Sequence, residues 1–144
     1  MSPSRLPDSI LCLALLAFAG LGACKPKAGA PCGTKADCGD AMVCLEKQCL
    51  SPEAAQDRCG TSDSCKSYGS CTPFEGACEA RTDADCKRST WCAQLGWCSF
   101  RERAIDNVRH CAAASSADCA QSDACKRSGR CTFDVKGDCV EKAQ

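Results

Sequence analysis

The feature that most constrains this chain is the spacing of its cysteines, which repeats four times as C-x5-C-x5-C. Eighteen of the 144 residues are cysteine, a content typical of a disulfide scaffold. One further cysteine follows each triplet, so four units of four account for sixteen of them. These units are Cys32, Cys38, Cys44 and Cys49; Cys59, Cys65, Cys71 and Cys78; Cys86, Cys92, Cys98 and Cys111; and Cys119, Cys125, Cys131 and Cys139.

The cysteines have to compensate for a small apolar core. Leucine, isoleucine, valine and phenylalanine make up only 11 of the 121 residues from position 24 onward, a content that without cross-links predicts disorder. A disulfide that closes about 15 residues removes roughly 3 kcal/mol of unfolded-state entropy, so two per unit can offset the missing core. The predicted fold is therefore small and disulfide-rich, with tandem four-cysteine modules that each hold a short helix and a small hairpin.

The N-terminal 23 residues have the composition of an export signal. An apolar run over 10–23 is too short for a membrane-spanning helix, which needs about 20 residues. The run ends in Leu21-Gly22-Ala23-Cys24, which resembles the lipobox of bacterial lipoproteins. That resemblance implies cleavage after Ala23 and a lipid on the thiol of Cys24. The alternative is an ordinary signal peptide or an uncleaved anchor, with Cys24 in a disulfide.

Lipid attachment predicts where the mature chain lies. The membrane is then a partner through the lipid on Cys24, residues 24–31 form a short polar tether, and Lys25 implies, by the same resemblance, sorting to the outer membrane. Sixteen cysteines remain after Cys12 is removed and Cys24 is lipidated. An even number in an exported chain favours eight disulfides.

The repeat divides the mature chain into modules 1 to 4, over 32–50, 51–80, 81–114 and 115–144. Modules 2 and 4 share Gly-x-Cys-Thr at Gly69 and Gly129, whereas module 1 has its glycine directly after its second cysteine. Module 1 is thus either a true repeat or a different module with the same spacing. Together with the lipobox, these motifs resemble cysteine-rich repeat lipoproteins predicted from myxobacterial-type genomes, a resemblance that implies architecture and location but no settled activity.

Helix-start and helix-stop signals lie at similar places in the later modules. Thr82-x-x-Asp85 and Ser115-x-x-Asp118 are variants of the capping box, and Ser51 precedes a proline at the first helical position. Gly96 and Gly129 suit left-handed helix ends. These signals predict helices over 52–58, 83–95 and 116–128, each followed by a hairpin.

The spacing limits the disulfide pairing without settling it. Residues six apart on a helix point about 120° from each other, so Cys119 and Cys125 are not expected to bridge. Pairing of the first cysteine with the third and the second with the fourth remains open, as does pairing of the first with the fourth and the second with the third.

The sequence offers little for catalysis, metal binding or nucleic-acid binding. No two cysteines are separated by fewer than four residues, so the Cys-x-x-Cys pairs of zinc and redox sites are absent from the sequence. His110 is the only imidazole, and we expect it to be solvated. Eighteen positive charges balance eighteen negative ones, which argues against nucleic acid. We expect no metal, no cofactor and no enzymatic activity.

Module 3 carries the most distinctive surface candidate. Trp91, Trp97 and Phe100 lie close to Arg101 and Arg103, and aromatic and arginine side chains dominate protein-binding hot spots. The competing interpretation is that the aromatic rings form the small core of this module. We therefore predict an exported binding or structural scaffold with an unknown envelope or extracellular protein as its partner. The alternative function is an inhibitor or regulator of a secreted protease.

Overall fold

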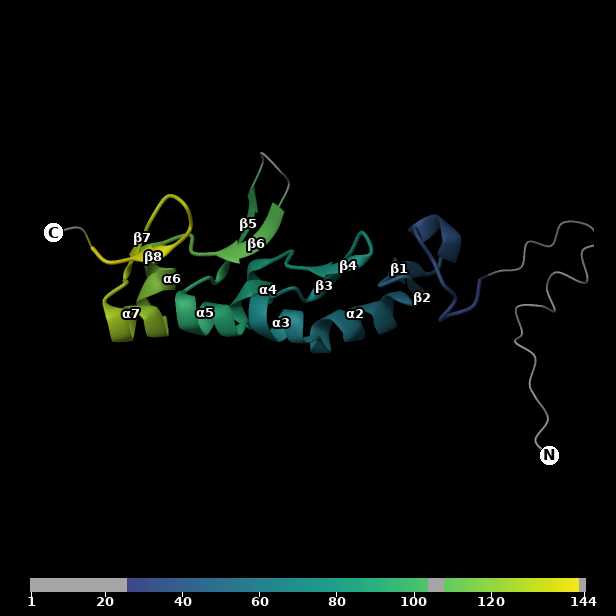
Figure 1. Ribbon diagram of the computed structural model, residues 1–144, viewed down its shortest axis with the longest axis horizontal. Helices are drawn as coiled ribbons and strands as arrows, with labels where there is room; N and C mark the ends of the chain where they lie inside the picture. The colour runs from purple at the N-terminus through teal and green to yellow at the C-terminus, as the bar shows by residue number, and fades with distance from the viewer. Residues whose placement is uncertain (1–25, 104–107, 143–144) are drawn as a thin grey trace, which may run out of the picture.

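The modules follow one another in an elongated row (Figure 1). The computed structural model describes residues 26–103 and 108–142, so the predicted signal peptide and Cys24 lie outside the described residues. Each module contributes one two-stranded antiparallel sheet, and the longer helices of modules 2 to 4 lie along one edge of the row while the hairpins lie toward the other (Figure 1). The predicted fold class is confirmed. Within residues 26–103 and 108–142, no helix has the length and apolar character needed to cross a bilayer.

Modules 2 to 4 share one element order, and module 1 has a shorter version of it. Module 1 contains η2 (Lys35–Cys38), β1 (Val43–Leu45) and β2 (Gln48–Leu50). Module 2 contains α2 (Pro52–Thr61), α3 (Asp63–Tyr68), β3 (Thr72–Phe74) and β4 (Ala77–Glu79). Module 3 contains α4 (Asp83–Lys87), α5 (Thr90–Leu95), β5 (Ser99–Arg103) and β6 (Val108–Ala112). Module 4 contains α6 (Ser116–Ala120), α7 (Asp123–Ser128), β7 (Thr132–Phe133) and β8 (Cys139–Val140).

All sixteen cysteines of the repeat form disulfides, in two different patterns. Module 1 pairs first with third and second with fourth, as Cys32–Cys44 and Cys38–Cys49. Modules 2 to 4 instead nest a short bridge inside a long one. The long outer bridges are Cys59–Cys78, Cys86–Cys111 and Cys119–Cys139. The short inner bridges are Cys65–Cys71, Cys92–Cys98 and Cys125–Cys131. Cys119 and Cys125 do not bridge, as predicted.

The long helices predicted over 83–95 and 116–128 are wrong, because each is broken into two short helices. The break falls at Ser89 in module 3 and at Ser122 in module 4. Ser89 has extended backbone (φ −84°, ψ 152°), and its hydroxyl accepts the N–H of Cys92 at 3.0 Å. A buried serine that caps a second helix cannot also continue the first one. Ser62 plays the same part in module 2, where α3 was not predicted at all.

The second helix of each later module ends at a left-handed glycine. The φ angles are 78° at Gly69, 80° at Gly96 and 67° at Gly129, so the predicted ends at Gly96 and Gly129 are confirmed. The N–H of each glycine donates back to the carbonyl of the second cysteine in its module. The inner disulfide closes the same corner two residues later.

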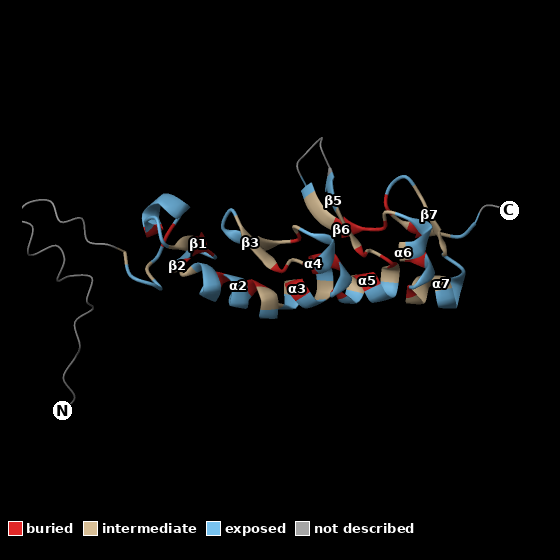
Figure 2. Ribbon diagram, turned by 180° about the vertical axis from the view of Figure 1, so that it is seen from behind, coloured by how far each residue is buried: buried red, intermediate tan, exposed pale blue. Residues whose placement is uncertain are grey.

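The core consists of small, sulfur-rich clusters. The buried residues accordingly lie in short stretches spread along the row (Figure 2). In one cluster Ala80, the last residue of module 2, packs with Cys86 and Cys111 of module 3, and Trp97 and Phe100 pack against it. Among residues 26–103 and 108–142, Leu45 is the only large aliphatic side chain that is almost fully buried, at 1% exposure. Disulfides thus occupy the positions that aliphatic side chains hold in larger domains.

Neighbouring modules 2 and 3 meet at a glycine that faces the next outer disulfide. A Cβ added to Gly69 would lie 2.8 Å from the Asp85 carbonyl oxygen and 2.8 Å from the Cys111 sulfur. The Thr72 hydroxyl donates to the Asp85 carboxylate at 3.1 Å. Only glycine leaves room for this approach, so the junction depends on the absent side chain.

The junction of modules 3 and 4 repeats this geometry. A Cβ at Gly96 would lie 2.7 Å from the Cys139 sulfur, and the Ser99 hydroxyl donates to the Asp118 carboxylate at 3.0 Å. Modules 1 and 2 join differently, through an apolar cluster of Leu45, Ala55 and Cys59.

Candidate protein-binding surface

The two tryptophans predicted for the binding surface lie at the contact between modules 2 and 3. Trp91, on α5, is half-buried, and its ring lies 4.4 Å from the Tyr68 ring and 4.8 Å from the Trp97 ring, both edge-to-face. Trp97 and Phe100 pack on the sulfur cluster of module 3. The rings therefore tie two modules together, which is a structural task.

The two predicted arginines follow Phe100 on β5. The side chain of Arg101 is exposed and lines a cleft with a volume of about 550 Å³, whereas the side chain of Arg103 lies outside the described residues. Arg101 thus lines a cleft that none of the predicted aromatic residues lines.

The 550 Å³ cleft lies between the hairpin of module 3 and the turn of module 4. Its lining residues are Arg101, Glu102, His110, Ala112, Val135, Lys136, Gly137 and Asp138. Arg109 neutralises Glu102 across the hairpin, with Nε 3.2 Å from Oε1. Arg101 and Lys136 form no ion pair with another described residue, and neither does the Asp138 carboxylate that also lines the cleft, so the cleft presents two cations and one carboxylate.

A rigid turn forms one wall of this cleft. The Asp134 carboxylate accepts the N–H groups of Lys136 and Asp138, both at 2.9 Å. Val135 projects from the turn and is 97% exposed. The hydrogen-bonded turn therefore offers an apolar side chain directly beside a cleft that holds Arg101 and Lys136.

His110 is less solvated than predicted. It lies opposite Arg101 in the β5–β6 ladder and is half-buried, and its Nδ1 is enclosed without a hydrogen-bond partner in the part of the chain that the structure describes. No described cysteine retains a thiol for this imidazole to activate.

A second cleft, with a volume of about 390 Å³, lies between the hairpins of modules 1 and 2. Its apolar wall consists of Val43, Leu45, Pro73 and Phe74. The two hairpin turns are bonded to each other, because the Glu46 N–H donates to the Gly76 carbonyl at 3.0 Å. The cleft thus lies between modules 1 and 2, which do not meet through a glycine junction.

Phe74 is an organising residue that the sequence analysis missed. The guanidinium of Arg81 lies 3.8 Å from the centre of its ring and that of Arg109 lies 4.7 Å from it. Arg109 also pairs with Glu79 at 3.4 Å, and so fastens β6 to module 2. No signal in the sequence pairs a phenylalanine with arginines seven and thirty-five residues later.

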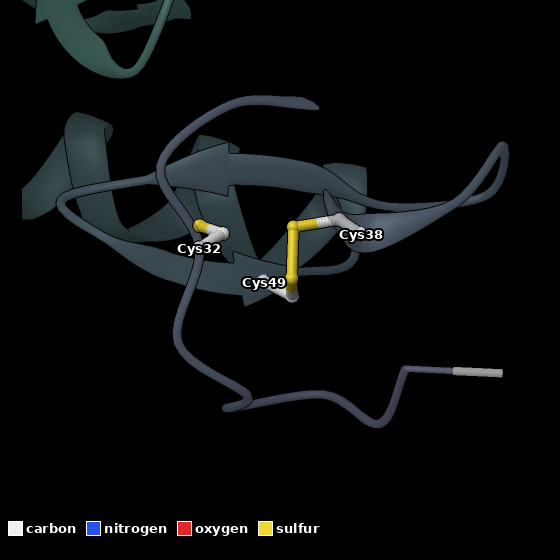
Figure 3. A group of neighbouring side chains, drawn as sticks. All are labelled: Cys32, Cys38 and Cys49. Atoms are coloured by element: carbon white, nitrogen blue, oxygen red, sulfur yellow. A yellow bond between two sulfur atoms is a disulfide. The ribbon is translucent and has the colours of Figure 1, made fainter. Parts of the chain in front are cut away.

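Three cysteine sulfurs of module 1 lie close enough to resemble a metal site (Figure 3). The sulfurs of Cys32, Cys38 and Cys49 all lie within 4.8 Å of one another. Each is already in a disulfide, and a disulfide sulfur is not the thiolate that binds a metal. The cluster is therefore a piece of disulfide core.

One carboxylate in module 1 has a perturbed titration. The Asp37 carboxylate accepts the N–H groups of Thr34 and Gly33, both at 2.8 Å, and these bonds hold the pKa of Asp37 below its ordinary value. The charged form of Asp37 therefore caps the start of η2.

Comparison with family models, with curated proteins and with solved structures found no match to this chain. Eight disulfides place the protein in an oxidising environment, extracellular or in the cell envelope.

Proposed function

We propose that this protein is an exported, lipid-anchored scaffold of the bacterial cell envelope that binds a protein partner through its row of hairpins. The observation that carries the proposal is the cleft between modules 3 and 4, where Arg101 and Lys136 face solvent beside the exposed Val135. Disulfides and glycine junctions hold the walls of this cleft in place. A partner segment with a carboxylate and an aliphatic side chain complements them.

Photo-crosslinking in intact cells tests the binding surface. A photoreactive residue replaces Arg101 in one strain, and replaces Gln94, an exposed residue of α5 on the helix edge, in a control strain. We expect one light-dependent adduct from position 101 and none from position 94. The adduct should disappear when Lys136→Glu is added. Equal adducts at both positions, or none at 101, would contradict a binding surface on the hairpin edge.

Metabolic labelling tests the anchor. Cells that express the chain are fed an alkyne-tagged fatty acid, and the label on the protein is compared between Cys24→Ser and Cys12→Ser. Since Cys12 lies inside the apolar run, its replacement is a matched control. We expect Cys24→Ser to lose the label and Cys12→Ser to retain it. Label on both variants would refute lipid attachment at Cys24.

Inhibition of a secreted protease is the second candidate, and the turn at Val135 is the observation that favours it. A rigid turn with one fully exposed side chain resembles the substrate segment that such inhibitors present, and valine suits a protease with a small specificity pocket. Titration against an elastase-type protease should then give stoichiometric inhibition that Val135→Asp abolishes and Lys136→Asp largely preserves. Hydrolysis without inhibition would dismiss this candidate.

A further inference from the structure

The two internal junctions, modules 2–3 and 3–4, are built from the same pair of faces. One face, here the tail face, carries Gly-x-Cys followed by Thr or Ser, at 69–72 in module 2 and 96–99 in module 3. The other face, here the head face, carries the motif Thr/Ser-x-x-Asp-Cys. This motif lies at 82–86 in module 3 and at 115–119 in module 4. In both junctions the glycine approaches the outer disulfide while the hydroxyl donates to the aspartate.

Module 4 carries a tail face that nothing in the described chain covers. Its Gly129-x-Cys131-Thr132 repeats the motif, but a Cβ at Gly129 meets no atom within 4 Å. Gly69 and Gly96 are buried, whereas Gly129 is exposed. The adjoining Cys125 is also only half-buried, although its counterpart Cys65 is 2% exposed.

Module 1 carries the matching head face, whose Asp37 no described residue covers, although Gly33 and Thr34 also line the cleft shared with the hairpin of module 2. Thr34-x-x-Asp37-Cys38 has the capping box of the later modules, and Asp37 is exposed, whereas its counterpart Asp85 is 7% exposed. The Asp37 carboxylate accepts the N–H groups of Gly33 and Thr34. The Asp85 carboxylate accepts those of the equivalent residues, Arg81 and Thr82.

The sulfur cluster beneath this face is equivalent as well. Cys32, Cys38 and Cys49 pack together in module 1 (Figure 3). Ala80 packs in the same way with Cys86 and Cys111 of module 3. Cys38–Cys49 joins the C-terminal part of a short helix to a second strand, just as the outer bridge of module 3 does.

We propose that the tail face of one copy of this protein binds the head face of a second copy. The Thr132 hydroxyl then donates to the Asp37 carboxylate of the second copy, and the α-carbon of Gly129 lies against its Cys38–Cys49 disulfide.

This contact is heterologous, so every added copy leaves one head and one tail available. Such contacts form open chains unless the rotation between copies closes a ring. The inference goes beyond the proposed function, because it requires neither the lipid nor a partner protein. A failure of either proposal is therefore distinguishable from a failure of the other.

Sedimentation velocity tests the proposal on the exported chain with Cys24→Ser, which removes lipid-driven association. Concentrations run from about 10 µM to about 1 mM, the range in which a small interface associates. We expect the mean sedimentation coefficient to rise with concentration beyond that of a dimer. Gly129→Asn should weaken association at least ~10-fold, because asparagine keeps the left-handed backbone but inserts a side chain between the faces.

Gly29→Asn is the matched control. Gly29 also has positive φ, at 85°, and a Cβ there meets no atom within 4 Å. Its replacement should leave association unchanged. Intact mass with all eight disulfides verifies that both variants are folded.

Mixing distinguishes head-to-tail contact from contact between two tails. Gly129→Asn chains retain the head face, so they should join wild-type chains and shorten the assemblies. Wild-type chains that stay monomeric at about 1 mM would overturn the proposal. The proposal would also be overturned if Gly129→Asn chains associated with one another as strongly as wild-type chains do. It would equally be overturned if Gly129→Asn chains failed to join wild-type chains in the mixture.

Discussion

Modules 1 and 3 build the same turn and hairpin with different cysteines. Cys38–Cys49 in module 1 occupies the place of Cys86–Cys111 in module 3. Cys32 stands two residues before the capping residue Thr34, and Ala80 stands two residues before the capping residue Thr82. Cys44, the disulfide partner of Cys32, lies opposite Cys49, just as Phe100 lies opposite Cys111. The same C-x5-C-x5-C spacing therefore places its cysteines at different structural positions in the two modules, and the spacing alone does not reveal this difference.

The frame determines how each module meets the next. Module 3 adds α5 and a short disulfide, which together present Gly96 to module 4. Module 1 has no counterpart of this helix among its described residues, and joins module 2 through Leu45 instead. A repeat can therefore retain its hairpin while its junction changes from a glycine contact to an apolar one.

Disulfide removal is the largest test of this difference. Cys86→Ala with Cys111→Ala opens a bridge between residues 25 apart, for an expected loss of about 3.5 kcal/mol in the chain-entropy model. Cys92→Ala with Cys98→Ala opens one between residues six apart, for an expected loss of about 2 kcal/mol.

Module 1 should show no such asymmetry, because its bridges span 12 and 11 residues. Hydrogen exchange resolved by module measures the local free energies of opening. Equal losses for the two bridges of module 3 would show that loop length does not govern its stability.

Alanine at the junction glycines gives the next largest effect. Gly69→Ala places a Cβ 2.8 Å from a carbonyl oxygen and a sulfur of module 3, so we expect a loss of about 3 kcal/mol. Gly129→Ala meets no neighbour and should cost about 1 kcal/mol for the left-handed backbone alone. Denaturant unfolding at low protein concentration compares the two free energies. Similar costs at both sites would remove the steric basis of the junction.

Converting module 1 to the pattern of module 3 should cost less. Cys32→Ala with Cys44→Phe reproduces the residues at 80 and 100, and the phenylalanine offsets part of the lost bridge, for a net loss of about 2 kcal/mol. Cys38→Ala with Cys49→Ala serves as the contrast and should cost about 3 kcal/mol, because no side chain replaces that bridge. Amide spectra of module 1 distinguish the outcomes, and a converted module without its β1–β2 ladder would contradict the shared frame.

The smallest effect is the pH dependence of module 1. The folded pKa of Asp37 is lowered by the N–H groups of Thr34 and Gly33, so its contribution to stability is complete above the ordinary aspartate pKa. It is lost as the pH falls through the lowered folded value. The Thr34 and Gly33 amide shifts should titrate together at this low pH in NMR spectra. Asp37→Asn should abolish that titration, and shifts that move only near the ordinary pKa would contradict the cap.

Local signals in the sequence predicted part of this fold. Thr82 and Ser115 cap helices as their spacing with Asp85 and Asp118 predicts, and Gly96 ends one. These features depend on residues three or four apart, so the sequence carries them directly. The helix breaks were missed, although a serine stands three residues before the second cysteine of each later module, at 62, 89 and 122.

Longer-range features could not be predicted in the same way. The disulfide pairing depends on which cysteine each hairpin brings back to the helix, and both patterns allowed by the spacing occur. The division of the proposed surface, with Trp91 packed against Tyr68 and Arg101 facing a cleft, depends on how module 3 meets its neighbours. Single modules give no sign of that arrangement.

The nesting of the disulfides also sets the mechanical behaviour of the chain. Tension applied at the ends passes through each outer bridge and bypasses the residues inside it. Only the segments 50–58, 79–85 and 112–118 can then lengthen between the first and last modules, at about 3.5 Å per residue. While its disulfides are oxidised, the protein therefore has a nearly fixed maximum length under tension. Reduction of the disulfides would allow the residues inside the bridges to extend as well.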